Sequence, residues 1–473
     1  MTELLRRSGQ APLHVRVLPT SDPVGEVRDG RERSLELVLC QLHRIRVLSC
    51  ASLRSLPPQC VKMLAGTAPQ LRRLALGGRL VKAPPSPRDE PDDDHIFCPA
   101  MLFQGNTPRL EYLELNVLCH GLRFRGPFSG SLRHLKIRVN GKQVKRPWPG
   151  LDDLLDLLSM LPSLEILDMR QDDRPEYPSD ESRRIHLPHL HTIRLLWGAY
   201  HIAELLEHID SPPPKLLDVA ADSMYCCDDM LGKALRHTVG DVCSVQTLKI
   251  SGFQFLVREQ LRIQGDAVGN RPDGTQEHLQ FTITLLDGQC VGEYIIWLLC
   301  QHVLDLQALS AFTLEMEDAL YEDYLAILET MYEVKTFTLS GLQVMRALPR
   351  MIAPKSSRFH QRHHGYIPLI DYNPDDDSDE DPEDYVDHWP SPFLLPALET
   401  IVVRGAILMN DWCFKYDHLE NYVDELCSVL RERASGGAAV KELCFKECSS
   451  ASKTVMSPLQ DVMEETGGRL TVI

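Results

Sequence analysis

The stretch Leu110-Glu-Tyr-Leu-Glu-Leu115 decides the fold, because its pattern L-x-x-L-x-L returns along the chain. The last two apolar positions are two residues apart, so their side chains point to the same side of a β-strand. The first position turns the chain into that strand. Repetition of this pattern is typical of leucine-rich repeats.

Ten copies carry an aliphatic residue or Phe at the three apolar positions, and several of them follow a proline. Their number outweighs the chance matches that a residue as common as Leu produces. We also expect an earlier copy at Leu42-Ile45-Val47, and weaker strand segments at Leu13 to Val17, Leu216 to Val219 and Phe281 to Leu285. The ten copies are Leu71-Leu74-Leu76, Leu110-Leu113-Leu115, Leu132-Leu135-Ile137, Leu164-Leu167-Met169, Leu190-Ile193-Leu195, Val245-Leu248-Ile250, Leu309-Phe312-Leu314, Val334-Phe337-Leu339, Leu398-Ile401-Val403 and Val440-Leu443-Phe445.

Segments with helical spacing of apolar residues lie between these strands. Leu151 to Leu161 has leucines on one stripe, which predicts a helix. Strand followed by helix, repeated, predicts an α/β leucine-rich-repeat solenoid with a horseshoe-like curve. Parallel strands would line its concave face and helices its convex face. Further helices are predicted over His201–Ile209, Met230–His237, Val291–Val303, Tyr321–Tyr332 and Leu419–Arg431.

Two observations qualify this fold. A doubly wound α/β domain is the alternative, and it would place a glycine-rich phosphate turn after an early strand, which the sequence lacks. Regular repeats of this class also carry Asn or Cys three places after the last Leu. Few copies have either residue there, Cys50 and Cys448 among them, so we expect irregular repeats.

We expect one domain over residues 1–473, a single solenoid interrupted by two insertions. Residues 79–99 are rich in Pro and acidic residues, and residues 355–392 are first basic and then acidic. Like charges at this density repel one another and bury no core, so we expect a disordered loop over 355–392. The alternative is an ordinary surface loop with no role.

The net charge of -17 at pH 7 predicts that the partner is not a nucleic acid. Most of the excess lies in 89–94 and 371–387, which hold fifteen acidic residues. The most apolar stretch, Val291 to Leu304, contains Glu293 and is too short to cross a membrane. The N-terminus has no apolar signal segment, and the cysteines have no recurrent spacing. We expect a monomeric intracellular protein, cytoplasmic or nuclear, with reduced thiols and no membrane contact.

Groups of residues that suggest chemistry have simpler explanations. His360, His363 and His364 lie in the second insertion with no Cys nearby, and a metal needs three or four converging ligands. His186, His189 and His191 flank the strand predicted at Leu190, where alternation places their side chains on different faces. Cys226-Cys227 has no further His or Cys at the spacing of a metal site. The motifs of nucleotide-binding, zinc-protease and serine-hydrolase sites are absent from the sequence. We therefore expect no catalytic residue, no cofactor and no metal.

Two segments resemble fungal F-box proteins with degenerate leucine-rich repeats. The opening Leu4-Leu-Arg-Arg-Ser-Gly-Gln-Ala-Pro-Leu-His-Val-Arg-Val is similar to the stretch that follows the F-box in that family. Phe103-Gln-Gly-Asn-Thr-Pro-Arg-Leu-Glu-Tyr-Leu-Glu-Leu is similar to the family's F-x-G-x-x-P-x-L-x-x-L-x-L segment. Pro162-Ser-Leu-Glu-Ile-Leu and Leu187-Pro-His-Leu are similar to the same kind of segment in that family.

The resemblance implies that the repeats hold a substrate of a cullin ubiquitin ligase. In the family, the F-box docks on the Skp1 adaptor. This sequence has no F-box before Leu13 and no Leu-Pro-x-Glu opening, so we expect that this chain alone does not bind Skp1. The first hypothesis is a substrate-recognition part or relic of such a ligase. The alternatives are a stand-alone leucine-rich-repeat scaffold and an acidic histone-chaperone-like binder. An enzyme fits least.

The side chains that alternate with the buried leucines are the candidates for binding a protein partner on the concave face. We expect a mildly basic stripe in the middle repeats and hydroxyl groups in the later ones. Ser378, which precedes Asp379, Glu380 and Asp381, is a candidate phosphosite that would add charge to the acidic insertion. The candidate binding residues are Arg73, Tyr112, Glu114, His134, Lys136, Arg138, Asp168, Arg170, Arg194, Lys249, Glu315, Thr336, Thr338 and Arg404.

Overall fold

The computed structural model describes residues 1–18, 26–51, 56–79, 103, 107–118, 130–139, 151–171, 183–222, 228–239, 243–255, 258–270, 276–285, 304, 306–315, 328, 330–354, 393–405, 417–447 and 453–473. Cys448, Ser378, the histidine triple at 360–364, Cys226-Cys227, the predicted helix over Val291–Val303, most of the one over Tyr321–Tyr332, residues 355–392 and nearly all of 79–99 lie outside them. The chain divides into two compact units. Unit 1 is Met1–Asp241 with Leu279–Asp287, and unit 2 is Val242–His278 with Gly288–Ile473.

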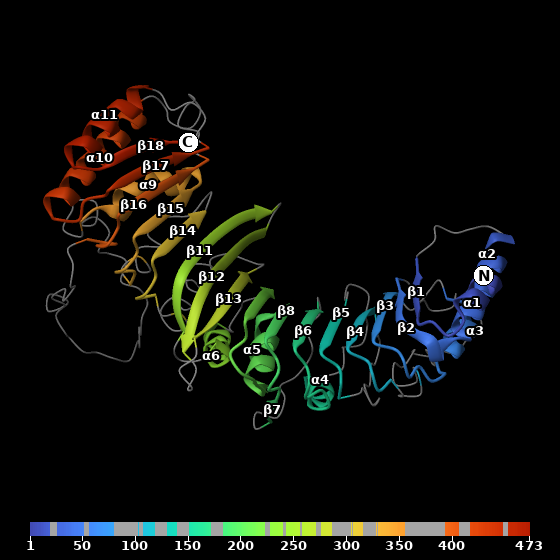
Figure 1. Cartoon of the computed structure of the whole chain (residues 1–473). Helices are drawn as coiled ribbons and strands as arrows, with labels where there is room; N and C mark the ends of the chain where they lie inside the picture. The colour runs from blue at the N-terminus through green and yellow to red at the C-terminus, as the bar shows by residue number, and fades with distance from the viewer. Residues whose placement is uncertain are drawn as a thin grey trace, which may run out of the picture. The chain divides into compact units, whose positions relative to one another are not determined.

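Unit 1 is built on parallel strands that pair in the order β1-β2-β3-β4-β5-β6-β8-β10-β13 (Figure 1). Every neighbouring pair in this series is parallel. A separate parallel pair joins β7 (Ile185–His186) and β9 (Ile209–Asp210). The bounds of the main strands are β1 Leu13–Val17, β2 Ile45–Cys50, β3 Arg73–Arg79, β4 Tyr112–Leu118, β5 His134–Val139, β6 Ile166–Gln171, β8 Thr192–Gly198, β10 Leu216–Asp222 and β13 Gln276–Leu285.

The repeated leucines form the core of unit 1. The register places the second apolar position of each copy beside that of the next strand, so these side chains form a continuous row under the sheet. Each is at most 2% exposed. The apolar side chains of neighbouring strands therefore lie beside one another along the sheet. The row is Leu74, Leu113, Leu135, Leu167, Ile193 and Leu217.

The copy predicted at Leu42-Ile45-Val47 is wrong by three residues. Strand β2 pairs Leu48 with Leu74 and Cys50 with Leu76, while Val47 pairs with Arg73. The apolar positions are therefore Ile45, Leu48 and Cys50, all at most 2% exposed. The sequence offers two overlapping matches here, and only pairing with β3 selects one. Cys50 consequently belongs to the core and not to a loop ladder.

Helices of unit 1 cover the leucine side of the sheet. Helix α4 (Leu151–Ser159) buries the leucine stripe predicted for it, and α5 (Ala199–His208) packs against β8 and β10 and against α6 (Asp228–Val239). The helices predicted over His201–Ile209 and Met230–His237 are confirmed. At the N-terminal end lie α1 (Thr2–Ser8), α2 (Glu26–Leu39), the short 3-10 helix η1 (Leu42–Arg44) and α3 (Pro58–Met63).

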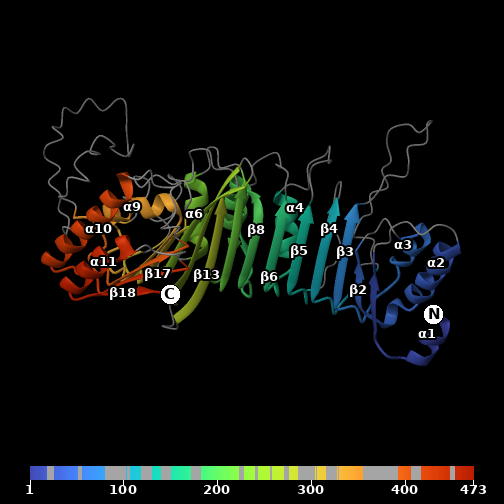
Figure 2. The same ribbon diagram turned by 90° about the horizontal axis from the view of Figure 1, so that it is seen from above.

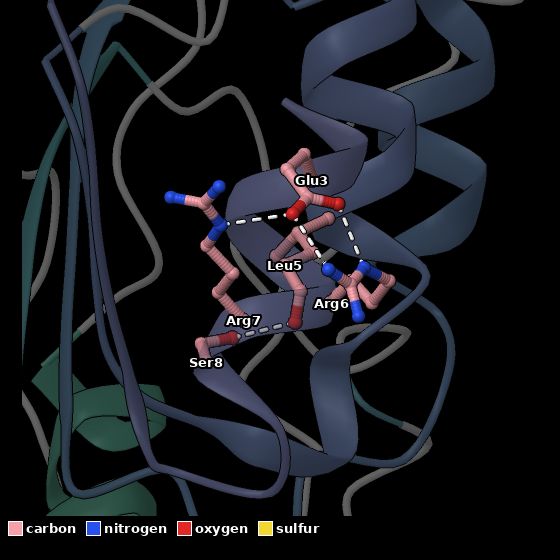
Figure 3. A network of polar contacts seen from close by, with 5 residues as sticks. All are labelled: Glu3, Leu5, Arg6, Arg7 and Ser8. Carbon is pink, nitrogen blue, oxygen red and sulfur yellow. Dashed lines mark hydrogen bonds and ion pairs between the residues drawn. The ribbon is translucent and has the colours of Figure 1, made fainter.

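Helix α1 buries no residue, and polar contacts within the helix link its own turns (Figure 3). The Glu3 carboxylate pairs with Arg6 at 2.7 Å and with Arg7 at 2.8 Å, and these hydrogen bonds lower the pKa of Glu3. The Ser8 hydroxyl donates to the Leu5 carbonyl. Arg44, which is 6% exposed, donates to the Ser8 hydroxyl and to the Ala11 carbonyl, both at 2.9 Å. This buried arginine ties the turn between α1 and β1 to β2.

Unit 2 contains six strands that pair in parallel in the order β11-β14-β15-β16-β17-β18, and β11 also pairs antiparallel with β12. Figure 2 shows helices α9, α10 and α11 beside this sheet. The strands are β11 Cys243–Phe255, β12 Arg258–Asn270, β14 Ala311–Glu315, β15 Thr336–Ser340, β16 Thr400–Arg404, β17 Glu442–Lys446 and β18 Arg469–Val472, and the helices are α9 Leu342–Ile352, α10 Asp417–Ser435 and α11 Lys453–Glu465.

The antiparallel hairpin departs from the predicted all-parallel arrangement. The copy at Val245-Leu248-Ile250 lies in β11, which pairs with β14 in parallel as predicted, but its other edge pairs with β12. Strand β12 contains no L-x-x-L-x-L copy and buries Ile263 and Ala267, so the repeat search gave no sign of it. The remaining copies in unit 2 lead into parallel strands as predicted. Both units are therefore α/β, with large, mostly parallel sheets whose strands alternate with helices.

A buried arginine closes the base of the second insertion in unit 2. Arg433 of α10 is fully buried and donates to the carbonyls of Ile352 at 3.0 Å, Leu394 at 3.1 Å and Leu395 at 2.9 Å. Its guanidinium lies 5.1 Å from the centre of the Phe393 ring. Burial lowers the pKa of Arg433 to about 10. Since Pro354 also forms a β-bridge with Phe393, the two chain segments that flank residues 355–392 lie side by side.

Candidate functional site

The residues that alternate with the buried leucines form one side of the unit 1 sheet, which we call the polar face. Parallel register aligns them into rows that cross the strands. The middle row alternates in charge from β4 to β10, because each acidic residue has a basic neighbour on the adjoining strand. It reads Ser49, Ala75, Glu114, Lys136, Asp168, Arg194, Asp218 and Thr282.

Glu114 is the best-paired residue of this row. Its carboxylate lies 3.1 Å from the Lys136 ammonium and accepts a hydrogen bond from the Tyr112 hydroxyl at 2.8 Å. Partial burial acts to raise the pKa of Glu114, but the hydrogen bonds from Tyr112 and Lys136 outweigh it, so this pKa lies below its usual value. Burial, followed by the hydrogen bond to Glu114, raises the pKa of Tyr112 to about 12. The carboxylate is therefore committed to two partners within the sheet.

An aromatic cluster borders the row on β3 to β5. The Arg73 guanidinium lies 4.6 Å from the centre of the Tyr112 ring, and the His134 ring meets Tyr112 edge-on at 5.6 Å. Partial burial lowers the pKa of His134, and the neighbouring charges of Arg73 and Arg194 act in the same direction. His134 is therefore neutral at pH 7. Tyrosine and arginine in contact are the side chains that most often anchor protein interfaces.

Asp168 occupies the centre of the polar face. It is 6% exposed, and the register places it between Lys136 and Arg194. Its Oδ1 lies 3.5 Å from Nε of Arg170 and accepts no hydrogen bond within the described residues. Buried carboxylate oxygens in proteins normally accept hydrogen bonds, so an orphaned one calls for an explanation.

The third row brings two arginines face to face. Arg138 on β5 pairs in register with Arg170 on β6. The Nε of Arg138 is buried and forms no hydrogen bond within the described part of the chain. Its other neighbour in the row is Asn116, which has no charge to offset it. The row reads Gly77, Asn116, Arg138, Arg170, Leu196, Ala220 and Thr284.

The corresponding face of unit 2 has a different character. Its middle row carries small hydroxyl, thiol and apolar side chains, and Thr338, Val402 and Cys444 are each at most 8% exposed. Lys249, at the start of the row, pairs with Glu315 at 2.7 Å. Thr336 is half-buried and Arg404 is exposed. The row reads Lys249, Thr313, Thr338, Val402, Cys444 and Thr471.

The candidate residues thus fall into two groups. Arg73, Tyr112, Glu114, His134, Lys136, Arg138, Asp168, Arg170 and Arg194 share the polar face of unit 1, whereas Lys249, Glu315, Thr336, Thr338 and Arg404 lie on strands of unit 2. The middle repeats combine the alternating charge row with the arginine pair Arg138 and Arg170 in the next row.

Sequence reasoning missed Asn116 and Asp218. Asn116 directly follows the copy Leu110-Leu113-Leu115 and points to the polar face with Glu114. Asp218 stands between the buried Leu217 and Val219, and that alternation was the available signal.

The described residues offer little for metal or thiol chemistry. No group of three His, Cys, Asp or Glu side chains among them is placed to hold a metal ion. Burial raises the pKa of the Cys60 thiol to about 11 and also raises that of Cys427, so both stay protonated at pH 7. None of the described helices is long and apolar enough to cross a membrane.

Comparison with known proteins gives no further guidance. Neither a protein-family model nor a curated protein matches this sequence.

Proposed function

We propose that this chain is a non-enzymatic leucine-rich-repeat solenoid protein that binds another protein on the polar face of unit 1. The observation that carries the proposal is the set of aligned rows on consecutive parallel strands. There Tyr112, Arg73 and His134 lie beside charged side chains, and the buried Nε of Arg138 forms no hydrogen bond within the described residues. Clustered arginine and tyrosine on a regular surface favour a protein partner.

The extent of the face also favours a macromolecule. The rows cross six neighbouring strands from β3 to β10, and strands in a sheet are about 4.8 Å apart, so the charged region is roughly 24 Å wide. A small ligand needs an enclosing pocket with a few converging polar groups. An open row of alternating charges instead matches a partner that is itself extended or broad, and such complementarity mainly sets specificity and association rate.

The resemblance to F-box proteins supports a particular role for that partner. In this reading, unit 1 holds the substrate of a cullin ubiquitin ligase or is a relic of such a receptor. The segment that resembles the family's lead-in forms α1 and β1, directly before the first repeat. A stand-alone scaffold is the alternative, and an acidic histone-chaperone-like binder is a further one, suggested by the acidic stretches.

Site-specific photocrosslinking tests the location of binding. A photoreactive phenylalanine analogue would replace Lys136 or Arg194 on the polar face, and Asp152 on α4 as a matched exposed control. We expect the two polar-face positions to crosslink the same protein in cells and Asp152 to crosslink none of it. Equal crosslinking from Asp152, or none from Lys136 and Arg194, would refute the proposal.

Identification of the crosslinked protein by mass spectrometry separates the roles. A protein that accumulates when the ubiquitin ligase is blocked indicates a substrate. Histones indicate the chaperone-like alternative, and a stable protein with neither property indicates a scaffold.

A further inference from the structure

Arg138 and Arg170 form a pair of like charges on neighbouring strands. They are direct cross-strand neighbours on β5 and β6, where side chains of opposite sign stabilise a sheet and side chains of like sign destabilise it. Asp168 approaches only Arg170, at 3.5 Å, and Glu114 is already held by Lys136 and Tyr112. An anionic group between the two guanidinium groups would offset their repulsion with its negative charge. A carboxylate suits this position, because it accepts paired hydrogen bonds from arginine.

Asp168 adds a requirement of the opposite kind. Its Oδ1 is buried and accepts no hydrogen bond within the described residues, although the residue stands two positions from Arg170 on the same strand. Oδ1 of Asp168 lies 3.5 Å from Nε of Arg170, so the two groups lie side by side on the polar face. A ligand that satisfies both features must therefore carry an acceptor anion and, directly beside it, a hydrogen-bond donor.

We propose that the polar face of unit 1 binds an extended acidic segment of the partner protein. One Asp or Glu carboxylate of that segment lies between Arg138 and Arg170, and a backbone N–H beside it donates to Oδ1 of Asp168. An acidic peptide supplies both groups at the required separation, whereas a free inorganic anion supplies only the acceptor. This inference rests on the proposed protein-binding function and names the chemistry of the partner.

A pair of synthetic peptides tests the inference on the purified full chain. One is fluorescein-labelled Gly-Thr-Glu-Thr-Glu-Thr-Gly, and the other has Gln in place of both Glu residues. We expect fluorescence anisotropy to show at least tenfold tighter binding of the Glu peptide, and substitution Arg138→Ala or Arg170→Ala to remove that preference. The matched control is Arg236→Ala, which removes the same charge from an exposed position on α6 and should leave binding unchanged.

Asp168→Ala separates the specific contact from general electrostatics. The substitution makes the face more positive, so charge attraction alone predicts tighter binding of the Glu peptide. The proposed N–H contact predicts weaker binding, by about tenfold, the effect of one hydrogen bond to a charged group. Methylating the donor nitrogen of the peptide should weaken binding to the wild type and have no further effect on Asp168→Ala. Circular dichroism confirms that each variant is folded.

The outcomes distinguish this inference from the proposed function. Three results would overturn the inference that the polar face binds an acidic segment. They are equal binding of the Glu and Gln peptides, no binding of either peptide, and tighter binding of the Glu peptide to Asp168→Ala. A phosphothreonine peptide that binds tenfold tighter than the Glu peptide would also overturn it, in favour of a phosphoryl group. In each case, crosslinks from Lys136 and Arg194 would leave the protein-binding function standing.

Discussion

Arg138 and Arg170 lie directly opposite each other on the neighbouring parallel strands β5 and β6. Arg194 lies on β8, in the middle row of the same face. It has acidic neighbours on both sides, Asp168 on β6 and Asp218 on β10. The same residue type therefore occupies an unfavourable and a favourable electrostatic setting within one sheet.

We expect Arg138→Thr to stabilise the fold. Threonine suits a strand, and the substitution removes the like-charge pair, so unfolding in urea should require about 0.2–1 kcal/mol more free energy. Arg194→Thr is the control, and it should destabilise by a similar amount because it removes a basic neighbour from both Asp168 and Asp218. A stabilising Arg194→Thr together with a destabilising Arg138→Thr would show that the register does not set these energies.

We expect Leu113→Ala and Leu115→Ala each to cost about 2–5 kcal/mol, because both side chains are 1% exposed and their removal leaves a cavity. Leu4→Ala, at a side chain that is 65% exposed, should cost far less. Hydrogen exchange should show the loss of protection first in the adjoining strands β3 and β5, since stacked repeats transmit damage to their neighbours. Uniform loss of protection across unit 1 would argue against stacked repeats.

Arg433→Met should destabilise unit 2 strongly. It leaves the carbonyls of Ile352, Leu394 and Leu395 without their donor, and each buried unpaired acceptor costs about 1–3 kcal/mol. Arg431→Met is the matched control on the same helix, because Arg431 is half exposed and pairs with Glu465 at the surface. Its loss should cost less than about 1 kcal/mol in urea unfolding. Equal losses of unfolding free energy in the two variants would contradict the structural role given to Arg433.

Glu114 should make stability depend on pH on the acid side. The hydrogen bonds from Tyr112 and Lys136 keep the pKa of Glu114 below its usual 4.5 in the folded chain. The stabilising contribution is therefore complete above pH 4.5 and is lost as the pH falls through the lower folded-state pKa. We expect the difference in Tm between wild type and Glu114→Gln to be constant near pH 6 and to shrink below pH 4.5. A difference that grows on acidification would have the wrong sign.

The sequence predicts the parallel strands because each one carries its own copy of a local pattern. Leu113 and Leu115 were assigned correctly for that reason, and the β2 copy was misplaced because two matches overlap between Leu42 and Cys50. Strand β12 and the edge strand β18 were not predicted, since neither contains the repeat. A search for one repeated pattern cannot predict strands whose apolar residues follow a different spacing.

The sequence predicts which residues belong to the candidate site, but it does not predict which of their charges interact. Alternation with the leucines places Glu114, Lys136 and Asp168 on one face, but only the register between strands shows which charges meet. Asp168 is 6% exposed, and its neighbours on the adjoining strands, Lys136 and Arg194, are known only once the register is known. Arg433 resembles an ordinary surface arginine in the helical pattern of α10, and its burial follows from the chain that returns at Phe393.

The bridge between Pro354 and Phe393 makes the position of residues 355–392 a natural grafting point. A guest domain spliced between these residues needs only closely spaced termini, because Arg433 and the bridge already hold the host chain on both sides of the graft. A fluorescent protein or an affinity module placed there would report on unit 2 without entering its sheet, and it would leave the polar face of unit 1 unaltered in sequence.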